Sequence, residues 1–350
     1  MIRFTCPCCG AEIFFDSRSC GSCKSLLAFD PRTLKFEQLQ KTSASGTLAA
    51  SNGNLCQNGT NYGVCNWLAE SGAQEGLCYG CQFNRTIPNL SRGENLERWH
   101  TIEAGKKRLL FSIIRLGLPL NNGWEHPNGG LLFDFLEDTR SSPSAESFFE
   151  TTGFLDGVIT LNVLEADPAL RFVEQKAANE VYRTVLGHLR HEIGHYFFTS
   201  FCEEEGLKKR FEALFGDNAS DYSSALDHFY AHGPKERWED DHITPYASAH
   251  PSEDWAETWG HYLHIHDTLE TAASFGLIDA QPQLLGFDQR IDRWRALSVG
   301  FNELNRSMGL ADAYPFVINP KVEEKLGFAA EVAKFLKTMD PSSAAAQPPS

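Results

Sequence analysis

Eight cysteines fall into two groups of four near the start of the chain, and they constrain its fold more than any other feature. The first group is Cys6 and Cys9, followed after ten residues by Cys20 and Cys23. Each CxxC pair forms a tight turn that directs two thiolates to one point, so two pairs supply the four ligands of a tetrahedral zinc ion. A redox-active CxxC is disfavoured because the strand-and-helix pattern around such a motif is missing. We therefore predict a structural zinc site.

The second group consists of Cys56, Cys65, Cys78 and Cys81. Only its second half is a CxxC pair, so a set of unrelated buried thiols is the alternative. A region as small as residues 1–90 cannot bury enough apolar surface to fold alone, and metal binding would supply the missing free energy. We predict that residues 1–90 form a zinc-ribbon region with two four-cysteine zinc sites.

Charge and hydropathy limit the partners and the location of the protein. The 350 residues carry a net charge of −15, which argues against nucleic acid as a partner. The longest apolar stretch, residues 109–120, is interrupted by Arg115 and Gly117 and is too short to span a bilayer. No apolar signal segment follows Met1. We expect a cytoplasmic protein without a membrane partner, in which paired cysteines bind metal rather than form disulfides.

The segment from His191 to His195, HEIGH, is the centre of the functional prediction. On a helix, residues four apart face the same side, so both imidazoles can bind one zinc ion while Glu192 takes a proton from water. The alternative is a surface helix with two solvated histidines. The apolar residues around the segment predict a buried helix instead, and buried histidines need partners. His188, one turn earlier, is expected to line the site rather than to bind metal.

A second helix, expected from about Ser252 to Ala273, offers the third ligand. Glu253 and Glu257 are four residues apart on one face, where two carboxylates repel each other unless a cation is near. We predict that Glu253 binds the zinc ion and that Glu257 orients a liganding histidine, with the reverse assignment as the alternative. With Ser252 as the N-cap, the acidic first turn could instead only complement the helix dipole. Tyr246, or else His250, is expected to stabilise the oxyanion, and we favour Tyr246.

Several further segments have a regular pattern. Helices are expected from near Asn95 and from Ala177 to about Ser200, and residues 157–162 alternate like a strand at the edge of a sheet. The low-complexity end, residues 341–350, is predicted to be disordered. Together these features predict an α+β protein with the ribbon region at 1–90 and a mainly helical domain with a short sheet at 95–340.

With these motifs in view, the chain resembles a bacterial family of zinc-binding metallopeptidases that carry an N-terminal zinc ribbon. The resemblance extends from Cys6 to about Phe328. Besides the ribbon cysteines it rests on the segments 65–67, 182–188, 190–196, 246–248, 250–257 and 304–309. It implies a zincin-like domain with a gluzincin-like site of two histidines and a glutamate. Anthrax lethal factor is similar in having a tyrosine seven residues before the liganding glutamate and another glutamate four residues after it, which supports the roles of Tyr246 and Glu257.

These observations predict a zinc-dependent hydrolase that cleaves peptide bonds in a peptide or protein substrate. The alternative is an adapter that binds a protein partner through the zinc ribbon and whose HExxH site is inactive or structural. A zinc hydrolase acting on a non-peptide amide is a third possibility. The zinc ribbon is also where a protein partner is expected to bind if the chain is a peptidase.

The sequence predicts three zinc ions per chain, one catalytic and two structural, because each four-cysteine group and the His–His–Glu set form one complete site. Elemental analysis of freshly purified full-length protein is expected to give this stoichiometry. A content of one zinc ion or none would contradict the prediction.

Overall fold

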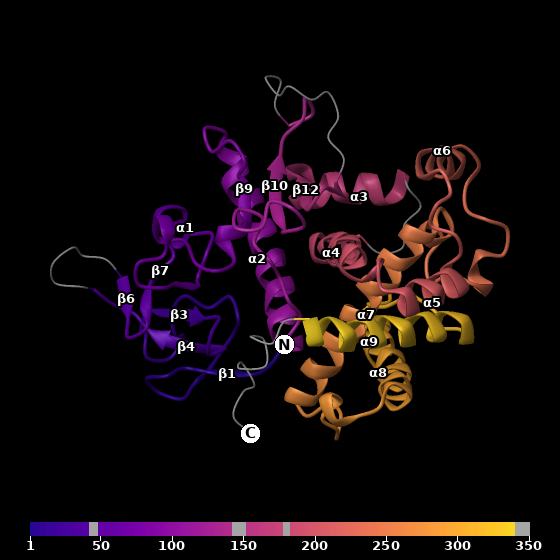
Figure 1. Cartoon of the computed structure of the whole chain (residues 1–350). Helices are drawn as coiled ribbons and strands as arrows, with labels where there is room; N and C mark the ends of the chain where they lie inside the picture. The colour runs from indigo at the N-terminus through magenta and orange to yellow at the C-terminus, as the bar shows by residue number, and fades with distance from the viewer. Residues whose placement is uncertain (42–47, 142–151, 178–182, 340–350) are drawn as a thin grey trace. The chain divides into compact units, whose positions relative to one another are not determined.

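The computed structural model describes residues 1–41, 48–141, 152–177 and 183–339. These residues divide into two compact units, one of residues 2–174 and one of residues 175–339 together with Met1 (Figure 1). Helix α3 (Pro168–Ala177) crosses the boundary. The module boundary predicted near residues 90–95 stays a prediction, because this division follows contacts within the fold. The predicted disordered tail, 341–350, lies outside the described residues.

The first part of the 2–174 unit is built from short antiparallel strands. Strand β1 pairs with β2 and β3 pairs with β4, while β5 to β8 form a four-stranded sheet in chain order. The bounds of these strands are Phe4–Thr5, Glu12–Ile13, Leu27–Asp30, Lys35–Gln38, Gln40–Lys41, Leu48–Ala50, Gly53–Leu55 and Leu68–Ala69. Three short helical elements accompany them: α1 (Gln57–Tyr62), η1 (Gln74–Gly76) and η2 (Cys81–Phe83).

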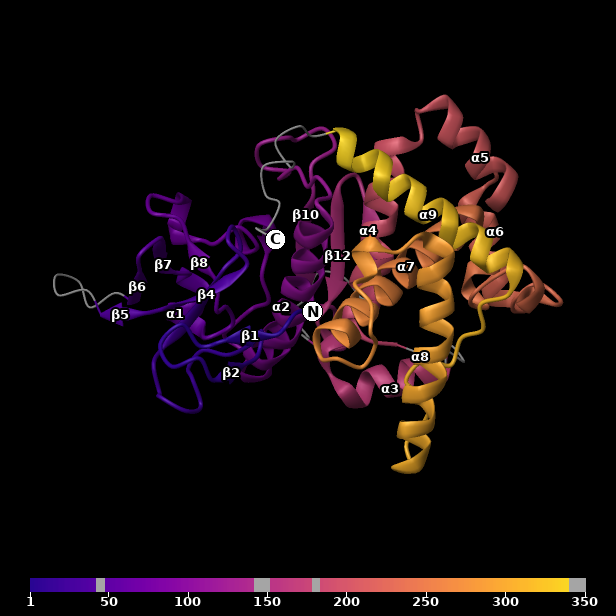
Figure 2. The ribbon, with the colours of Figure 1, turned by 90° about the horizontal axis from the view of Figure 1, so that it is seen from below.

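Helix α2 (Gly93–Leu116) is the long element of this unit and begins close to the predicted Asn95. On one side its Phe111 ring packs against Phe15 of the ribbon region at a centroid distance of 5.1 Å. On another side the Lys106 ammonium lies 5.6 Å from the ring centroid of Phe133 in β10. Figure 2 shows the helix beside both groups of strands. Helix α2 therefore connects the strands of the ribbon region to the sheet that contains β10.

The larger sheet of this unit has the strand order β11-β12-β10-β9, with bounds Gly153–Leu155, Val158–Asn162, Leu132–Leu136 and Asn84–Thr86. Strand β12 runs parallel to β10 and antiparallel to β11, and η3 (Val163–Ala166) follows it. The prediction of an edge strand at 157–162 is therefore wrong. Asp156 and Gly157 have φ values of 48° and 83°, which form a tight hairpin and fold β11 back onto β12.

The 175–339 unit is helical in its described part. Its helices are α4 (Val185–Phe201), α5 (Glu205–Phe215), α6 (Tyr222–His232), α7 (Pro251–Ser274), α8 (Phe287–Ser307) and α9 (Pro320–Met339), with short 3₁₀ turns η4 (Trp238–Asp240), η5 (Tyr246–Ser248) and η6 (Pro282–Leu284). Helix α9 packs on α5 and α7 (Figure 1). The α+β prediction, with a cysteine-rich N-terminal region and a mainly helical remainder, is confirmed. Among the described residues, no helix is long and apolar enough to cross a membrane.

Side-chain caps decide where the two helices of the predicted site begin. Thr184 is the N-cap of α4, and its hydroxyl accepts a hydrogen bond of 2.9 Å from the amide of Gly187. A helix that starts at Ala177 and continues to Ser200 is therefore wrong. The N-cap of α7 is His250 rather than the predicted Ser252, because the imidazole Nδ1 accepts from the Ser252 amide at 3.1 Å.

Helices α4 and α7 cross where both have small residues. A Cβ atom on Gly194 would lie 3.0 Å from Cα of Ala256 and 3.1 Å from Cβ of Trp259. The Trp255 indole donates a hydrogen bond of 2.8 Å to the carbonyl of Gly194, so a buried polar group is satisfied at the crossing. The glycine inside HEIGH is thus explained by packing, since a larger residue would separate the two helices.

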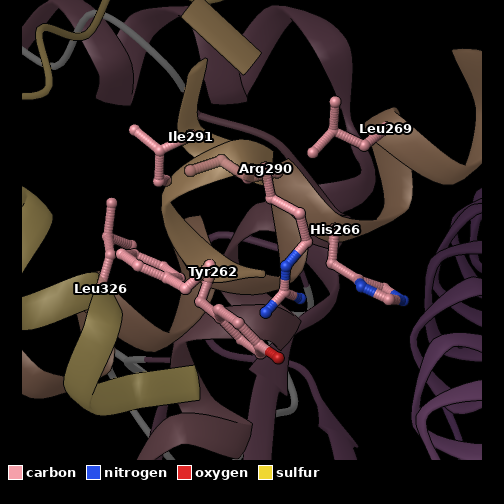
Figure 3. Close-up of a pocket in the computed structure, with 8 residues that line it drawn as sticks. Tyr262, His266, Leu269, Arg290, Ile291 and Leu326 are labelled. Carbon is pink, nitrogen blue, oxygen red and sulfur yellow. The ribbon is translucent and has the colours of Figure 1, made fainter. Parts of the chain in front are cut away.

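A small cavity lies among α7, α8 and α9 (Figure 3). Its lining is mostly apolar and includes Ile291 and Leu326, with Tyr262, His266 and Arg290 as polar members. Its volume is about 10 Å³, which is room for one water molecule. This cavity is therefore part of the packing of the helices and is too small for a substrate.

We predict that Gly194→Ala lowers the free energy of unfolding by about 1–3 kcal/mol, because the added methyl group overpacks the α4–α7 crossing. Gly300→Ala is the matched control, since Gly300 lies within α8 and its added Cβ would meet no atom within 4 Å. That change is expected to stabilise the protein by about 0.5–1 kcal/mol through helix propensity. Urea denaturation of both variants measures the difference, and equal effects would show that the crossing tolerates the methyl group.

Candidate metal centre

Helix α4 places the two histidines of HEIGH side by side. His191 and His195 are one turn apart, and their Nε2 atoms are 3.3 Å from each other. Both side chains are partly exposed, while neighbouring Ile193 is fully buried in the core. The helix is therefore anchored by its apolar face, as the sequence predicted, and presents both imidazoles at one point.

Helix α7 brings Glu253 to the same point. Its Oε2 lies 3.0 Å from Nε2 of His191 and its Oε1 lies 3.5 Å from Nε2 of His195. The ligand atoms of these three residues all lie within 4.8 Å of one another. The fold thus brings the three predicted ligands together, although Glu253 follows His191 by 62 residues in the sequence.

Glu257 contacts the opposite nitrogen of His191. Its Oε1 is 2.6 Å from His191 Nδ1. A proton on Nδ1 donates to this carboxylate and leaves the Nε2 lone pair for a metal ion. Burial raises the pKa of Glu257, but the hydrogen bond and charge of His191 outweigh it, so the pKa lies below its usual value. Glu257 therefore has the position of a residue that orients a ligand.

Glu192 is buried beside this group. Its Oε2 atom has no hydrogen-bond partner among the described residues. Burial is the main reason why its pKa lies above the usual value. A buried carboxylate oxygen without a partner is costly, so the position calls for an explanation other than structural stability.

The donor set fits a zinc ion. Two imidazole nitrogens and one carboxylate oxygen are ligands that zinc takes in hydrolytic enzymes, and three protein ligands leave a fourth position for water or substrate. The Glu192 carboxylate, whose Oε2 has no partner among the described residues, lies close enough to both histidines for their charges to lower its pKa against the effect of burial. The residues that would hold the ion are His191, His195 and Glu253.

Two tyrosines lie near Glu253. Tyr246, predicted to stabilise an oxyanion, has its ring centroid 6.0 Å from that of His191. Tyr222 was not identified from the sequence, and its hydroxyl donates a hydrogen bond of 2.8 Å to Glu253 Oε1. Burial and the charge of Glu253 raise the pKa of both phenols, so both remain proton donors.

No sequence signal marks Tyr222. It lies 31 residues before Glu253, on helix α6, which contains no buried residue in its own span. Its ring contacts His250 at a centroid distance of 5.2 Å. His250 is in turn used as the cap of α7 and lies 3.0 Å from the Ser220 hydroxyl, and the Tyr222 hydroxyl already donates to Glu253, so Tyr246 stays the preferred oxyanion candidate.

His188 lies one turn before His191 on α4 and is half-buried. It does not belong to the group of ligand atoms formed by the described residues. Its predicted place in the lining of the site stays a prediction.

Asp254, the neighbour of Glu253, fixes the start of α7. Its Oδ2 accepts a hydrogen bond of 2.6 Å from the buried Lys325 of α9 and lies 3.0 Å from Nδ1 of His242. Lys325 also donates to the carbonyl of Asp241 at 2.7 Å. These contacts hold the first turn of α7, and with it Glu253, in one orientation. Lys325 has no local signal in the sequence, because its partner Asp254 lies 71 residues away on another helix.

The first cysteine group closes around one point. The sulfur atoms of Cys6 and Cys23 are 3.7 Å apart, as are those of Cys9 and Cys20. Cys9 and Cys23 are exposed, and Cys8 is exposed outside the group. Four converging thiols of this kind fit a tetrahedral zinc ion.

The second cysteine group also converges, and it differs in burial. All four residues, Cys56, Cys65, Cys78 and Cys81, are buried. The sulfur atoms of Cys65 and Cys78 are 3.6 Å apart, and the amides of Trp67 and Cys78 point at sulfur atoms at 3.4 Å. The geometry therefore supports a second thiolate site.

The fold and these three groups define a zinc-binding protein that combines a ribbon region with a helical HExxH unit. Residues 95–332 match the model of the family described as "Putative zinc-binding metallo-peptidase", and residues 3–92 match that of a zinc-ribbon domain. The chain therefore belongs to this family, and the predicted resemblance to zinc-binding metallopeptidases with an N-terminal zinc ribbon is confirmed. The gluzincin-like character of the HExxH site stays a prediction.

Curated relatives show the same extent of similarity. The uncharacterized proteins Rv2568c and MT2644 of Mycobacterium tuberculosis and Mb2598c of Mycobacterium bovis are each 39% identical over 336 residues, covering 94% of this chain and 94% of each relative. No solved structure gives a significant match.

We predict that Glu253→Ala removes the metal ion of this centre, because two histidines alone leave an incomplete set of ligands. Glu257→Ala is the comparison, and it is expected to weaken metal binding by about 10–100-fold, as the loss of a residue that orients a ligand does. Titration of both variants with a competing chelator measures the difference. If Glu257→Ala loses the metal while Glu253→Ala retains it, the two assignments must be exchanged.

Proposed function

We propose that the protein is a zinc-dependent peptidase. His191, His195 and Glu253 hold the catalytic zinc ion, and the two cysteine groups hold two structural zinc ions. The observation that carries the proposal is the buried carboxylate of Glu192, whose Oε2 has no partner among the described residues and which lies beside the His–His–Glu group. A bound zinc ion supplies Lewis-acid chemistry, polarising the scissile carbonyl and lowering the pKa of water.

Glu192 is the general base in this proposal. Its carboxylate takes a proton from the attacking water and later delivers it to the nitrogen of the leaving amine. Its raised pKa, caused mainly by burial, brings the group closer to neutral pH, where it can both accept and release a proton.

Tyr246 and Tyr222 have different roles in this proposal. Tyr246 donates a hydrogen bond to the oxyanion that develops on the substrate carbonyl. Tyr222 donates to Glu253 at 2.8 Å and so fixes the carboxylate that holds the metal. Glu257 keeps His191 in the tautomer whose Nε2 is free to bind, through its 2.6 Å contact with Nδ1.

The adapter alternative, with an inactive or structural site, gives no role to Glu192. A structural zinc site is closed by four protein ligands, whereas the described residues provide three here. A peptide or protein substrate, a protein partner for the ribbon and a cytoplasmic location are parts of the proposal that rest on the sequence.

We predict that Glu192→Gln keeps the zinc ion and abolishes hydrolysis, because the amide is nearly the same size and cannot act as a base at neutral pH. Digestion of an unbiased peptide library, read by mass spectrometry, measures activity, and elemental analysis measures zinc. Glu212→Gln is the control, since Glu212 is exposed on α5, and it is expected to cleave like the parent protein. A Glu192→Gln variant that cleaves equally well would show that Glu192 is not the base.

A further inference from the structure

Two neighbouring lysines of α2 are buried next to the second cysteine group. Lys106 is 0% exposed and Lys107 is 4% exposed. Lysine is almost never buried without a partner, because desolvating an ammonium group is costly. The proposed hydrolysis uses neither residue, so their burial needs another explanation.

Lys106 has one acidic partner among the residues that the structure describes. Its Nζ atom lies 2.9 Å from Oε1 of Glu103 and donates to the side-chain oxygen of Asn84. Burial lowers the pKa of Lys106, but the negative charges of Glu103 and Cys81 outweigh it, so the pKa lies above its usual value. The Lys106 ammonium is thus paired with the carboxylate of Glu103, and the charge of Cys81 also acts on it.

Lys107 has no carboxylate partner in the described part of the chain. Its ammonium donates to the neutral side-chain oxygen of Asn66 at 3.0 Å and to the carbonyl of Val64 at 3.4 Å. Both residues adjoin Cys65, which belongs to the second group. The ammonium of Lys107 therefore lies beside the stretch of chain that carries Cys65. When the four cysteines bind zinc as thiolates, theirs is the negative charge that Lys107 faces.

Four thiolates and one zinc ion leave two negative charges in excess. In the second group all four cysteines are at most 1% exposed, so water cannot screen this charge. In the first group Cys9 and Cys23 are exposed, and the nearby Lys24 is exposed as well. The excess negative charge of the first group can therefore be screened by solvent, whereas that of the second group lies next to buried lysine ammonium groups.

We propose that Lys107, assisted by Lys106, is the built-in counter-charge of the second zinc site and that α2 and this site fold as one unit. The lysines lie within residues 95–332, whereas the cysteines lie within 3–92. Zinc bound by the ribbon therefore stabilises the first helix of the peptidase match. The zinc ion of the second group is held tightly, and that of the first group exchanges more readily. The inference rests on zinc in the second cysteine group and not on hydrolytic activity.

The test uses the full-length, zinc-loaded protein and measures zinc release to a chelator. Cysteine alkylation, mapped by mass spectrometry, assigns each release step to one group. In the parent protein the first group is expected to become alkylated earlier than the second. Lys107→Met is expected to speed release from the second group by about 10–100-fold, the usual effect of losing a residue that supports a metal site, and to leave the first group unchanged.

Two further variants serve as controls. Arg108→Met removes the neighbouring cation of α2, which pairs with Asp16 and lies over the Phe15 ring, and is expected to leave release from the second group unchanged. Lys107→Arg keeps the charge and is expected to restore slow release. Unchanged release in Lys107→Met, or equal acceleration in both cysteine groups, would overturn the inference.

A second measurement needs no variant. Reductive methylation of the parent protein during chelation reports when Lys107 becomes accessible. It is expected to be modified at the same rate as Cys56, Cys65, Cys78 and Cys81 become alkylated. Modification of Lys107 while these cysteines stay protected, or continued protection after all zinc is lost, would also overturn the inference.

Discussion

The close crossing of α4 and α7 is the constraint on which the rest of the metal centre depends. Gly194 lies between the two histidines of HEIGH and lets the helices approach, and Trp255 ties them together by its hydrogen bond to the Gly194 carbonyl. At this separation a carboxylate from the first turn of α7 reaches both imidazoles, and one from the next turn reaches the far nitrogen of His191. Trp255 and Trp259 of α7 both lie against Gly194, so the packing of side chains sets the distance between the helices without a metal ion.

The three glutamates near His191 and His195 are a second constraint on the candidate metal centre, because of their negative charge. Glu192, Glu253 and Glu257 are gathered around two imidazoles in a poorly solvated setting, where like charges repel strongly. Lys325 of another helix pairs with the adjacent Asp254 and, within the described part of the chain, forms no ion pair with the three glutamates. A divalent cation relieves this repulsion. In the second cysteine group of the ribbon, zinc leaves two negative charges in excess, and the proposed counter-charge there is the ammonium of Lys107.

The features that depend on local residue spacing could be predicted from the sequence, whereas those that depend on contacts between distant residues could not. HEIGH and its downstream glutamates follow from helical spacing, and the cysteine groups follow from the geometry of CxxC turns. The edge strand was wrong because Asp156 and Gly157 turn the chain into a hairpin that covers β12. The start of α4 was wrong because apolar spacing continues past the point where Thr184 caps the helix. Tyr222 and Lys325 have no local signature, since each acts through a partner on another helix.

Helix α6 buries none of its own residues, and one of its described contacts with the body of the unit is the hydrogen bond from Tyr222 to Glu253. A segment with so little buried surface opens locally at a small cost in free energy. Each opening withdraws a phenol from the carboxylate and admits solvent to it. Amide hydrogen exchange along α6 is therefore expected to depend on the ionisation and partners of Glu253, which couples the stability of a surface helix to a buried carboxylate.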